Sequence, residues 1–384
     1  MSNNRNLAID MFRGLTMALM VFVNDFWTVF NVPHFLEHYA TWEDGIGLSD
    51  YVFPMFLFAM GMSIPYALDR RMEKGYPLGD TLRHILSRTV ALLTMGVFIM
   101  NAEEGVAWNK GVYCVLMLVG FFLIWNQYSQ EFRWKKYLQW AGVILLAGLA
   151  VTYRSPGGDL FHAGWWGILG QIGWMYLFAS LAYLLCRNRP WILALLWGVF
   201  CFVNLTITPM REHAQWIGPN ILADLSGALQ LGNGHSIIMT LGGLLTILCE
   251  RRIRKAGWGI ALAAGAVLLV LALCFHQDWI FSKNLGTLPW CLMVSAVSVV
   301  LYTLLRLLEK KGWTAWFKPL SPAGTATLTV YMIPYFFVAL WIFISPTIPA
   351  WLSGWVGVGK CVLYTAVCIG IAWLLTKVGV KLKI

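Results

Sequence analysis

The residues best suited to chemistry lie in one stretch between the first two apolar segments of the chain. Residues 24–54 contain two histidines and five carboxylates but no lysine or arginine. A neutral imidazole can take a proton from an amine or a hydroxyl near pH 7, and it can also carry an acyl group. The stretch therefore predicts a proton-transfer site, with the candidate members His34, His38, Asp25, Glu37, Glu43, Asp44 and Asp50.

Two other interpretations of this stretch stay open. His34 and His38 are four residues apart, so on a helix they would share a face and would suit zinc. No third ligand stands at a fixed spacing, and we therefore predict no metal. The acidic residues would otherwise be solvated loop residues and caps, with Asp50 as the N-cap of the next helix.

Further polar residues stand at the ends of other apolar segments. Arg13, three residues after Asp10, either pairs with that carboxylate or reaches an anionic ligand. His235 follows glycines at a predicted helix start, a pattern typical of a cap and also of an anion or oxyanion site. Lys283 and Asn284 add a cation and an amide donor before the tenth apolar segment.

The composition requires a large apolar environment. Hydrophobic residues make up 59% of the 384 positions and charged residues 12%, against about 25% charged in a soluble protein. Disorder, a disulfide scaffold and an ordinary cytosolic enzyme are thereby excluded, and the 21 tryptophans and 14 tyrosines suit two membrane interfaces. The eight cysteines mostly lie within apolar runs and are predicted to be buried packing residues.

The apolar runs predict an all-α, polytopic membrane bundle, since a spanning helix needs about 20 apolar residues. We place twelve spans, with eleven as the alternative because two of them are short. We expect a single transmembrane domain over residues 1–384. The spans lie at roughly 9–31, 50–68, 85–101, 109–127, 137–153, 165–186, 190–208, 233–250, 257–276, 287–308, 324–345 and 358–378.

The net charge of +10 is a topology signal. With both termini in the cytoplasm, 23 of the 28 basic residues fall on the inner side, whereas 11 of the 18 acidic residues fall outside. This is the positive-inside bias of membrane proteins, so the charge does not indicate a nucleic-acid partner. The same topology brings His38, His235 and Lys283 to the outer side.

Several strings together resemble a known family. They are Asp10–Thr16 with Met20–Asn24, then His38 with Trp42 and Gly45, then Asp50–Gly61, Gly167–Ile172 and Lys283–Leu285. They resemble the heparan-α-glucosaminide N-acetyltransferase family of transmembrane acyltransferases, closely over residues 9–64 and more loosely to about residue 290. The spacing from His38 to Trp42 is one residue longer than in the family, and Gln171 stands where the family has arginine.

The resemblance implies a multi-pass enzyme of the bacterial inner membrane, in contact with lipid. Its donor would be cytosolic acetyl-CoA, and its acceptor a glucosamine-type amino sugar at the periplasmic side. The family's catalytic histidine falls on His38 and its nearby asparagine on Asn24, and the family also makes a homodimer plausible. His34 stays open as the working base because of the altered spacing.

The resemblance implies a role for each of the candidate site residues. His38 would be the general base or a transient acetyl carrier, Asn24 would bond the imidazole or the thioester carbonyl, and Asp50 would orient His38. His235 or Lys283 would bind the oxyanion or the phosphates of CoA, and Arg13 and Asn284 would also belong to the CoA site. A secondary transporter of a small sugar or anion and an O-acyltransferase of envelope glycans are the alternative functions.

Overall fold

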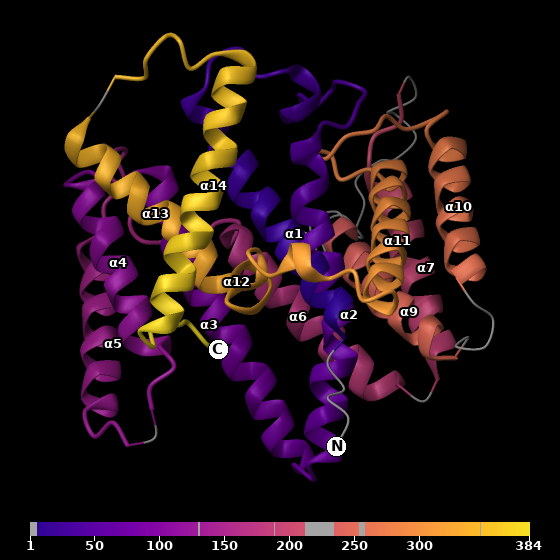
Figure 1. Cartoon of the computed structure of the whole chain (residues 1–384), viewed down its shortest axis with the longest axis horizontal. Coiled ribbons are helices and arrows are strands. Elements are labelled where there is room, and N and C mark those ends of the chain that lie inside the picture. Colours follow the sequence, from indigo (N-terminus) through magenta and orange to yellow (C-terminus); the bar gives the residue numbers. More distant parts are fainter. Residues whose placement is uncertain (1–5, 130, 188, 212–233, 253–257, 346) are drawn as a thin grey trace. The chain divides into compact units, whose positions relative to one another are not determined.

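The computed structural model describes residues 6–129, 131–187, 189–211, 234–252, 258–345 and 347–384. Within these ranges the regular elements are helices, and β-pairing is confined to the isolated bridges Phe30–Ser353 and Asn126–Leu382 (Figure 1). The predicted all-α class is therefore confirmed for the described part of the chain. Each of the predicted spans overlaps at least one helix.

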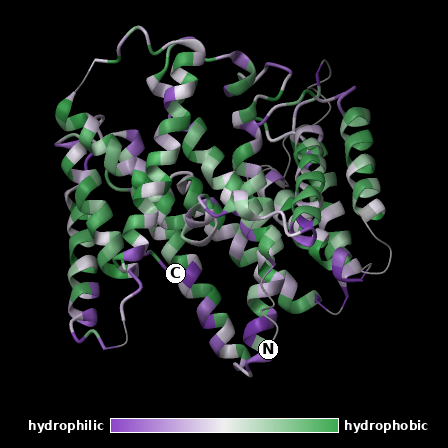
Figure 2. Ribbon diagram, in the orientation of Figure 1, coloured by the Kyte–Doolittle hydropathy of each residue, from purple (hydrophilic) through white to green (hydrophobic). Residues whose placement is uncertain are grey.

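Eight of the described helices are long and apolar enough to cross a membrane, namely α1, α2, α3, α6, α7, α11, α13 and α14. Hydrophobic residues run along the helices, and hydrophilic ones gather near helix ends and connecting segments (Figure 2). Large apolar side chains also remain exposed on helix surfaces, among them Val151, Leu185 and Leu363. A bundle of this kind suits a lipid environment, while the count of twelve spans and the inward termini stay predictions.

The described chain packs as two compact units. Unit 1 comprises residues 1–16, 33–89 and 174–318, and unit 2 comprises residues 17–32, 90–173 and 319–384. Three helices have residues in both units: α1 (Leu7–Val23), α3 (Leu78–Glu104) and α6 (Gly167–Cys186). The single domain over residues 1–384 stays a prediction.

In unit 1, α2 packs along α9 and α10 packs along α11. A Cβ atom at Gly61 would lie 1.9 Å from the carbonyl oxygen of Thr240, and one at Gly243 would lie 2.0 Å from that of Phe58. Glycine therefore lets the backbones of α2 and α9 meet closely, which fixes α2 in place. The helices that lie wholly in this unit are α2 (Leu48–Glu73), α7 (Pro190–Ile207), α9 (His235–Arg252), α10 (Trp258–Phe275) and α11 (Leu288–Lys310), with the short η2 (His34–Leu36) and η4 (Ala315–Phe317).

An apolar core ties the α3 and α6 segments of unit 1 to α2, α7 and α9. The core packs against the half of α2 that lies away from its first turn. It also contacts α3, which follows α2 after residues 74–77. Its buried members are Ile64, Leu68, Ile85, Tyr176, Ala179, Tyr183, Leu193, Leu244 and Leu248.

In unit 2, α13 packs against α4 and α14, and α4 packs against α5. The chain ends there, where the backbone N–H of Leu382 donates to Thr329 Oγ1 (3.0 Å). The helices that lie wholly in this unit are α4 (Lys110–Trp125), α5 (Lys135–Thr152), α12 (Ser321–Thr325), α13 (Thr327–Ile344) and α14 (Gly354–Lys377), with the short η1 (Phe26–Thr28).

Candidate active site

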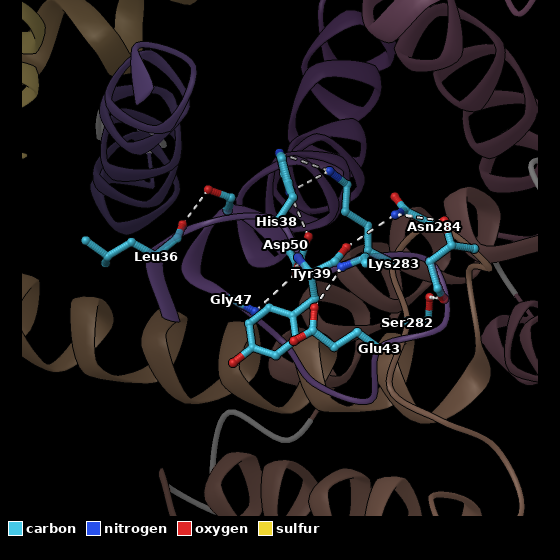
Figure 3. A network of polar contacts seen from close by, with 12 residues as sticks. Leu36, His38, Tyr39, Glu43, Gly47, Asp50, Ser282, Lys283 and Asn284 are labelled. Carbon is cyan, nitrogen blue, oxygen red and sulfur yellow. Dashed lines mark hydrogen bonds and ion pairs between the residues drawn. The ribbon is translucent and has the colours of Figure 1, made fainter. Parts of the chain in front are cut away.

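His38 and Asp50 form the centre of a polar network in unit 1 (Figure 3). His38 lies on the loop after η2, and its Nδ1 is 2.7 Å from Oδ1 of Asp50 on the first turn of α2. A carboxylate only accepts hydrogen bonds, so Nδ1 carries the proton in this pair. Nε2 is then the basic nitrogen, on a side chain that is 50% exposed. This arrangement orients an imidazole for proton transfer.

Asp50 also holds the backbone around it. Its Oδ2 accepts hydrogen bonds from the N–H groups of Gly47 (3.1 Å) and Tyr39 (3.2 Å), and the residue is 2% exposed. The N-cap of α2 is Gly47, so the expectation of Asp50 as the N-cap was wrong by three positions. Because Asp50 is the third residue of the helix, one of its oxygens caps the helix while the other faces His38.

Lys283 completes the centre from the segment between α10 and α11. Its Nζ is 3.1 Å from Nδ1 and 3.4 Å from Nε2 of His38, so the cation lies beside the ring. Burial lowers the pKa of Lys283, and the negative charge of Asp50 opposes that shift. The site thus combines an oriented base with a positive charge that could stabilise an oxyanion.

The loop that carries His38 is fastened to the segment that carries Lys283. Ser282 Oγ donates to the carbonyl of Thr41 (2.7 Å), and Asn284 Nδ2 donates to the carbonyl of Tyr39 (3.3 Å). On the other side of the loop, Ser49 Oγ donates to the carbonyl of Leu36 (2.6 Å). The structure therefore brings together His38, Asp50, Lys283 and Asn284, four of the residues singled out in the sequence.

Asp44 provides a further anchor for this loop. It accepts from the backbone N–H of Phe281 (2.9 Å), pairs with His276 (2.9 Å) and contacts Arg211. Burial raises the pKa of Asp44, but the hydrogen bonds from Phe281, His276 and Arg211 outweigh it and leave the pKa below the ordinary value of an aspartate. The carboxylate therefore favours the folded state, and its contribution is lost as the pH falls through that lowered pKa.

We expect the Asp44→Asn variant to unfold at a lower temperature than the parent protein at pH 6. The difference should shrink as the pH falls below the ordinary pKa of an aspartate, and it should be lost below the lowered pKa of the folded parent, where that carboxylate is also protonated. Thermal unfolding in detergent between pH 6 and pH 3 measures both quantities. Asp278→Asn, which removes an exposed acid from the segment between α10 and α11 that Asp44 contacts, is the matched control, and an equal destabilisation by both variants would contradict the role of Asp44.

The structure places His34 apart from the His38 pair. Its Nε2 is 2.6 Å from Oε1 of Glu43, and its ring stacks on Tyr39 with centroids 4.3 Å apart. Hydrogen bonds from the N–H of Ala40 and then from His34 lower the pKa of Glu43. His34 is thus engaged by an exposed carboxylate, whereas His38 is engaged by a buried one.

Three other predicted site residues have different surroundings. Arg13 Nη1 lies 3.9 Å from Oδ1 of Asp10, which is the local ion pair that their spacing allowed. His235 begins α9, and its ring meets Trp290 edge to face at 5.7 Å. Asn24 belongs to unit 2, whereas His38 belongs to unit 1, so a bond between them stays a prediction.

Asn24 lines a cavity of about 550 Å³ within unit 2. The wall is largely apolar, but Asp25, Glu103, Tyr335 and Lys360 also reach it. Tyr335 Oη donates to Oε1 of Glu103 (2.9 Å). Asn24 is an exposed residue, and it is one of the residues that line this cavity.

The ion pair between Asp25 and Lys360 in this wall was missed by the sequence reasoning, which counted Lys360 only as an outer basic residue. Nζ of Lys360 is 2.6 Å from Oδ2 of Asp25, and it also donates to Thr28 Oγ1 (2.7 Å). Asp25 is 5% exposed. The available signal was a charge inside each of two apolar segments, because such charges require partners.

We expect Lys360→Met to destabilise the protein strongly, by about 3–5 kcal/mol, since it leaves the buried Asp25 without its cation. The double variant Asp25→Asn, Lys360→Met should recover much of that loss. Melting temperatures in detergent give the comparison, with Lys377→Met at the exposed end of the same helix as the control. A double variant no more stable than Lys360→Met would count against the pair.

No group of three histidine, cysteine or acidic side chains suited to a metal is present among the residues that the structure describes. The absence of a metal from the reaction stays a prediction.

The chain matches known proteins in ways that bear on this site. A family model described as "Domain of unknown function (DUF5009)" matches residues 5–229, which is more than half of the chain. The chain belongs to this family. The DUF5009 match includes the loop of His38 and the start of α2, and ends before Lys283.

Two curated relatives of this DUF5009 protein are acetyltransferases. The heparan-alpha-glucosaminide N-acetyltransferase of Mus musculus is 36% identical over 116 residues, covering 28% of this chain and 16% of that protein. The enzyme of the same name from Homo sapiens is 34% identical over 110 residues, covering 27% and 15%. The resemblance drawn from the sequence is thereby confirmed, and the aligned region spans about a sixth of the length of these relatives.

Proposed function

We propose that the protein is a transmembrane N-acetyltransferase that moves acetyl from acetyl-CoA to the amino group of a glucosamine-type sugar. The observation that supports this most is the pair of His38 and Asp50, with Lys283 beside the imidazole. The pair provides a base whose basic nitrogen is accessible, next to a positive charge. The similarity to two N-acetyltransferases supplies the reaction class.

The reaction needs one proton transfer and one stabilised charge. Nε2 of His38 takes a proton from the acceptor amine while the amine nitrogen forms a bond to the thioester carbonyl carbon. The carbonyl oxygen becomes an oxyanion. The ammonium of Lys283 lies close to the ring of His38 and stabilises this negative charge. Collapse of this intermediate breaks the C–S bond, and the leaving thiolate takes the proton from His38. The products are an N-acetylated sugar and free CoA.

The two carboxylate oxygens of Asp50 have different roles. One fixes the tautomer of His38 and stabilises the imidazolium that forms during the proton transfer, as a carboxylate does in a catalytic triad. The other holds the backbone of Tyr39 and Gly47. A direct transfer needs no covalent enzyme intermediate. A transient acetyl group on His38 would instead give ping-pong kinetics.

We propose that the donor comes from the cytoplasm and that the acceptor is met at the periplasmic face of the bacterial inner membrane. The distribution of basic residues supports this orientation, since the predicted inner connections carry most of them. In that orientation the start of α2 and the segment of Lys283 face outward.

Purified protein in detergent, given acetyl-CoA and glucosamine, should release free thiol and form N-acetylglucosamine. A thiol reagent follows the rate, and mass spectrometry with fragmentation separates N-acetylation from O-acetylation. Thiol release that depends on no sugar amine would contradict the proposal. An O-acetylated product would indicate the envelope-glycan alternative, and an inert protein that moves sugar across vesicles would indicate a transporter.

A further inference from the structure

Basic residues gather at one end of unit 2, on two segments that are far apart in the sequence. One segment is the start of α5, and the other is the end of α14 with the residues that follow it. The basic residues, which we call the basic end of unit 2, are Arg133, Lys135, Lys136, Lys377, Lys381 and Lys383.

Hydrogen bonds bring these two segments to the same place. The backbone N–H of Gln127, just after α4, donates to the carbonyl of Lys381 (2.8 Å). The backbone N–H of Lys383 donates to the carbonyl of Trp125 (2.9 Å), and that of Lys381 donates to Oδ1 of Asn126 (2.8 Å). The residues after α14 are therefore paired with the connection from α4 that leads into α5.

The exposed side chains of α5 change in character along the helix. Trp134, Tyr137 and Trp140 are exposed at its start, whereas Ile144 and Val151 are exposed further along. Tryptophan and tyrosine concentrate at the level of lipid headgroups, and aliphatic side chains face the hydrocarbon. The start of α5, where hydrophilic residues also gather (Figure 2), therefore lies at headgroup level.

The end of α14 repeats this pattern. Val362 and Leu363 are exposed in the middle of the helix, and Trp373 and Lys377 are exposed at its end. Nζ of Lys377 lies 3.7 Å from the centroid of the Trp373 ring, so the cation contacts an aromatic ring of the kind found at a membrane interface. Two helices thus independently place the basic end of unit 2 at headgroup level.

Little negative charge balances these cations. The sequence ranges of unit 2 contain five acidic residues, namely Asp25, Glu103, Glu104, Glu131 and Asp159. Of these, Glu131 alone lies in the connection that leads into α5. Within the described ranges, no carboxylate is at ion-pair distance from Arg133, Lys135 or Lys136. The positive charge at this end therefore attracts anions from outside unit 2.

We propose that the basic end of unit 2 binds the headgroups of anionic phospholipids. Their phosphodiester accepts charge-assisted hydrogen bonds from arginine and lysine. The rings of Trp134 and Tyr137, whose centroids are 5.6 Å apart, lie between these cations in the sequence and are exposed to the adjoining glycerol and acyl groups. This inference goes beyond the proposed function and does not depend on it.

A lipid fits this surface better than an acidic segment of another protein. The cations alternate with exposed aromatic residues, and exposed aliphatic residues follow them along both helices. A phospholipid presents the same order of groups, with a charged headgroup, a glycerol backbone and acyl chains. The predicted topology also places this end on the cytoplasmic side, where anionic lipids attract basic residues.

The experiment titrates the full-length protein in detergent with phosphatidylglycerol and, separately, with phosphatidylcholine. Native mass spectrometry gives the dissociation constant of the first bound lipid. A triple variant, Arg133→Gln with Lys135→Gln and Lys136→Gln, should bind phosphatidylglycerol about tenfold or more weakly, since each basic residue near a headgroup contributes about fivefold. Its affinity for phosphatidylcholine should stay within about twofold of the parent.

A variant that keeps the charge is the matched control. Arg133→Lys with Lys135→Arg and Lys136→Arg should bind phosphatidylglycerol within about threefold of the parent. Raising the salt from about 50 mM to about 500 mM should reduce the parent's preference for phosphatidylglycerol and should change the glutamine variant much less, because salt screens exposed charges. If the glutamine variant does not fold, Lys377→Gln with Lys383→Gln should weaken phosphatidylglycerol binding in the same direction.

Equal dissociation constants for phosphatidylglycerol in the parent and the glutamine variants would overturn the proposal. An equal loss of both lipids, or the same loss in the variant that keeps the charge, would also overturn it. If the glutamine substitutions remove an acidic protein and leave lipid binding unchanged, the surface serves a protein partner and the proposal is wrong. Acetyl transfer is measured separately, so its failure leaves the lipid site standing.

Discussion

His38→Ala is expected to lower the rate of acetyl transfer by about 10³-fold while the protein still folds. Nε2 of His38 is the basic nitrogen of the only imidazole that the described residues place against a buried carboxylate. General base catalysis contributes about 10²- to 10⁴-fold, and the amine attacks poorly while it keeps its proton. The side chain is half-exposed, so its loss leaves little cavity. Thiol release from acetyl-CoA measures the rate, and the melting temperature checks the fold.

His34→Ala is the matched control for this experiment. It removes the same side chain from the same loop, but the lost contacts are an exposed carboxylate and a ring stack. We expect its rate to stay within about threefold of the parent, because exposed ion pairs contribute little. A His38→Ala protein with near-parental turnover, or a larger loss in His34→Ala, would show that the base has been misassigned.

The fold class could be predicted because it depends on a signal that is local in the sequence. A run of about 20 apolar residues reports a membrane helix wherever it lies. Boundaries depend on neighbours instead: the first span was expected to reach residue 31, but α1 ends at Val23. The chain turns there, and Asp25 pairs with Lys360, more than 300 residues further on. Hydropathy contains no information about such a partner.

The candidate site was partly predictable for a related reason. Successive spans cross the membrane in alternating directions, and this alternation predicted that His38 and Lys283 lie on the same side, although 245 residues separate them. The topology could not give their contact, nor the double role of Asp50, which depends on the third position of α2.

Asp50→Asn is expected to lower kcat by about 10³- to 10⁴-fold with a small change in stability, the effect known for a base held in the wrong tautomer. The N–H groups of Tyr39 and Gly47 require an acceptor, so the carbonyl oxygen of the new amide must take the place of Oδ2. Its NH₂ group then faces Nδ1 of His38 and donates to it. The ring proton moves to Nε2, which can no longer accept a proton from the amine.

The geometry makes this variant more informative than Asp50→Ala, which would remove the helix cap together with the orienting group. Asp50→Asn should keep the KM for acetyl-CoA and the melting temperature near parental values, whereas a purely structural role would lower the melting temperature as well. Asp80→Asn, in the first turn of α3, controls for the loss of a helix-start carboxylate. If Asp50→Asn retains more than about a third of the parental kcat, the tautomer of His38 does not limit the reaction, and the base must act through another pair.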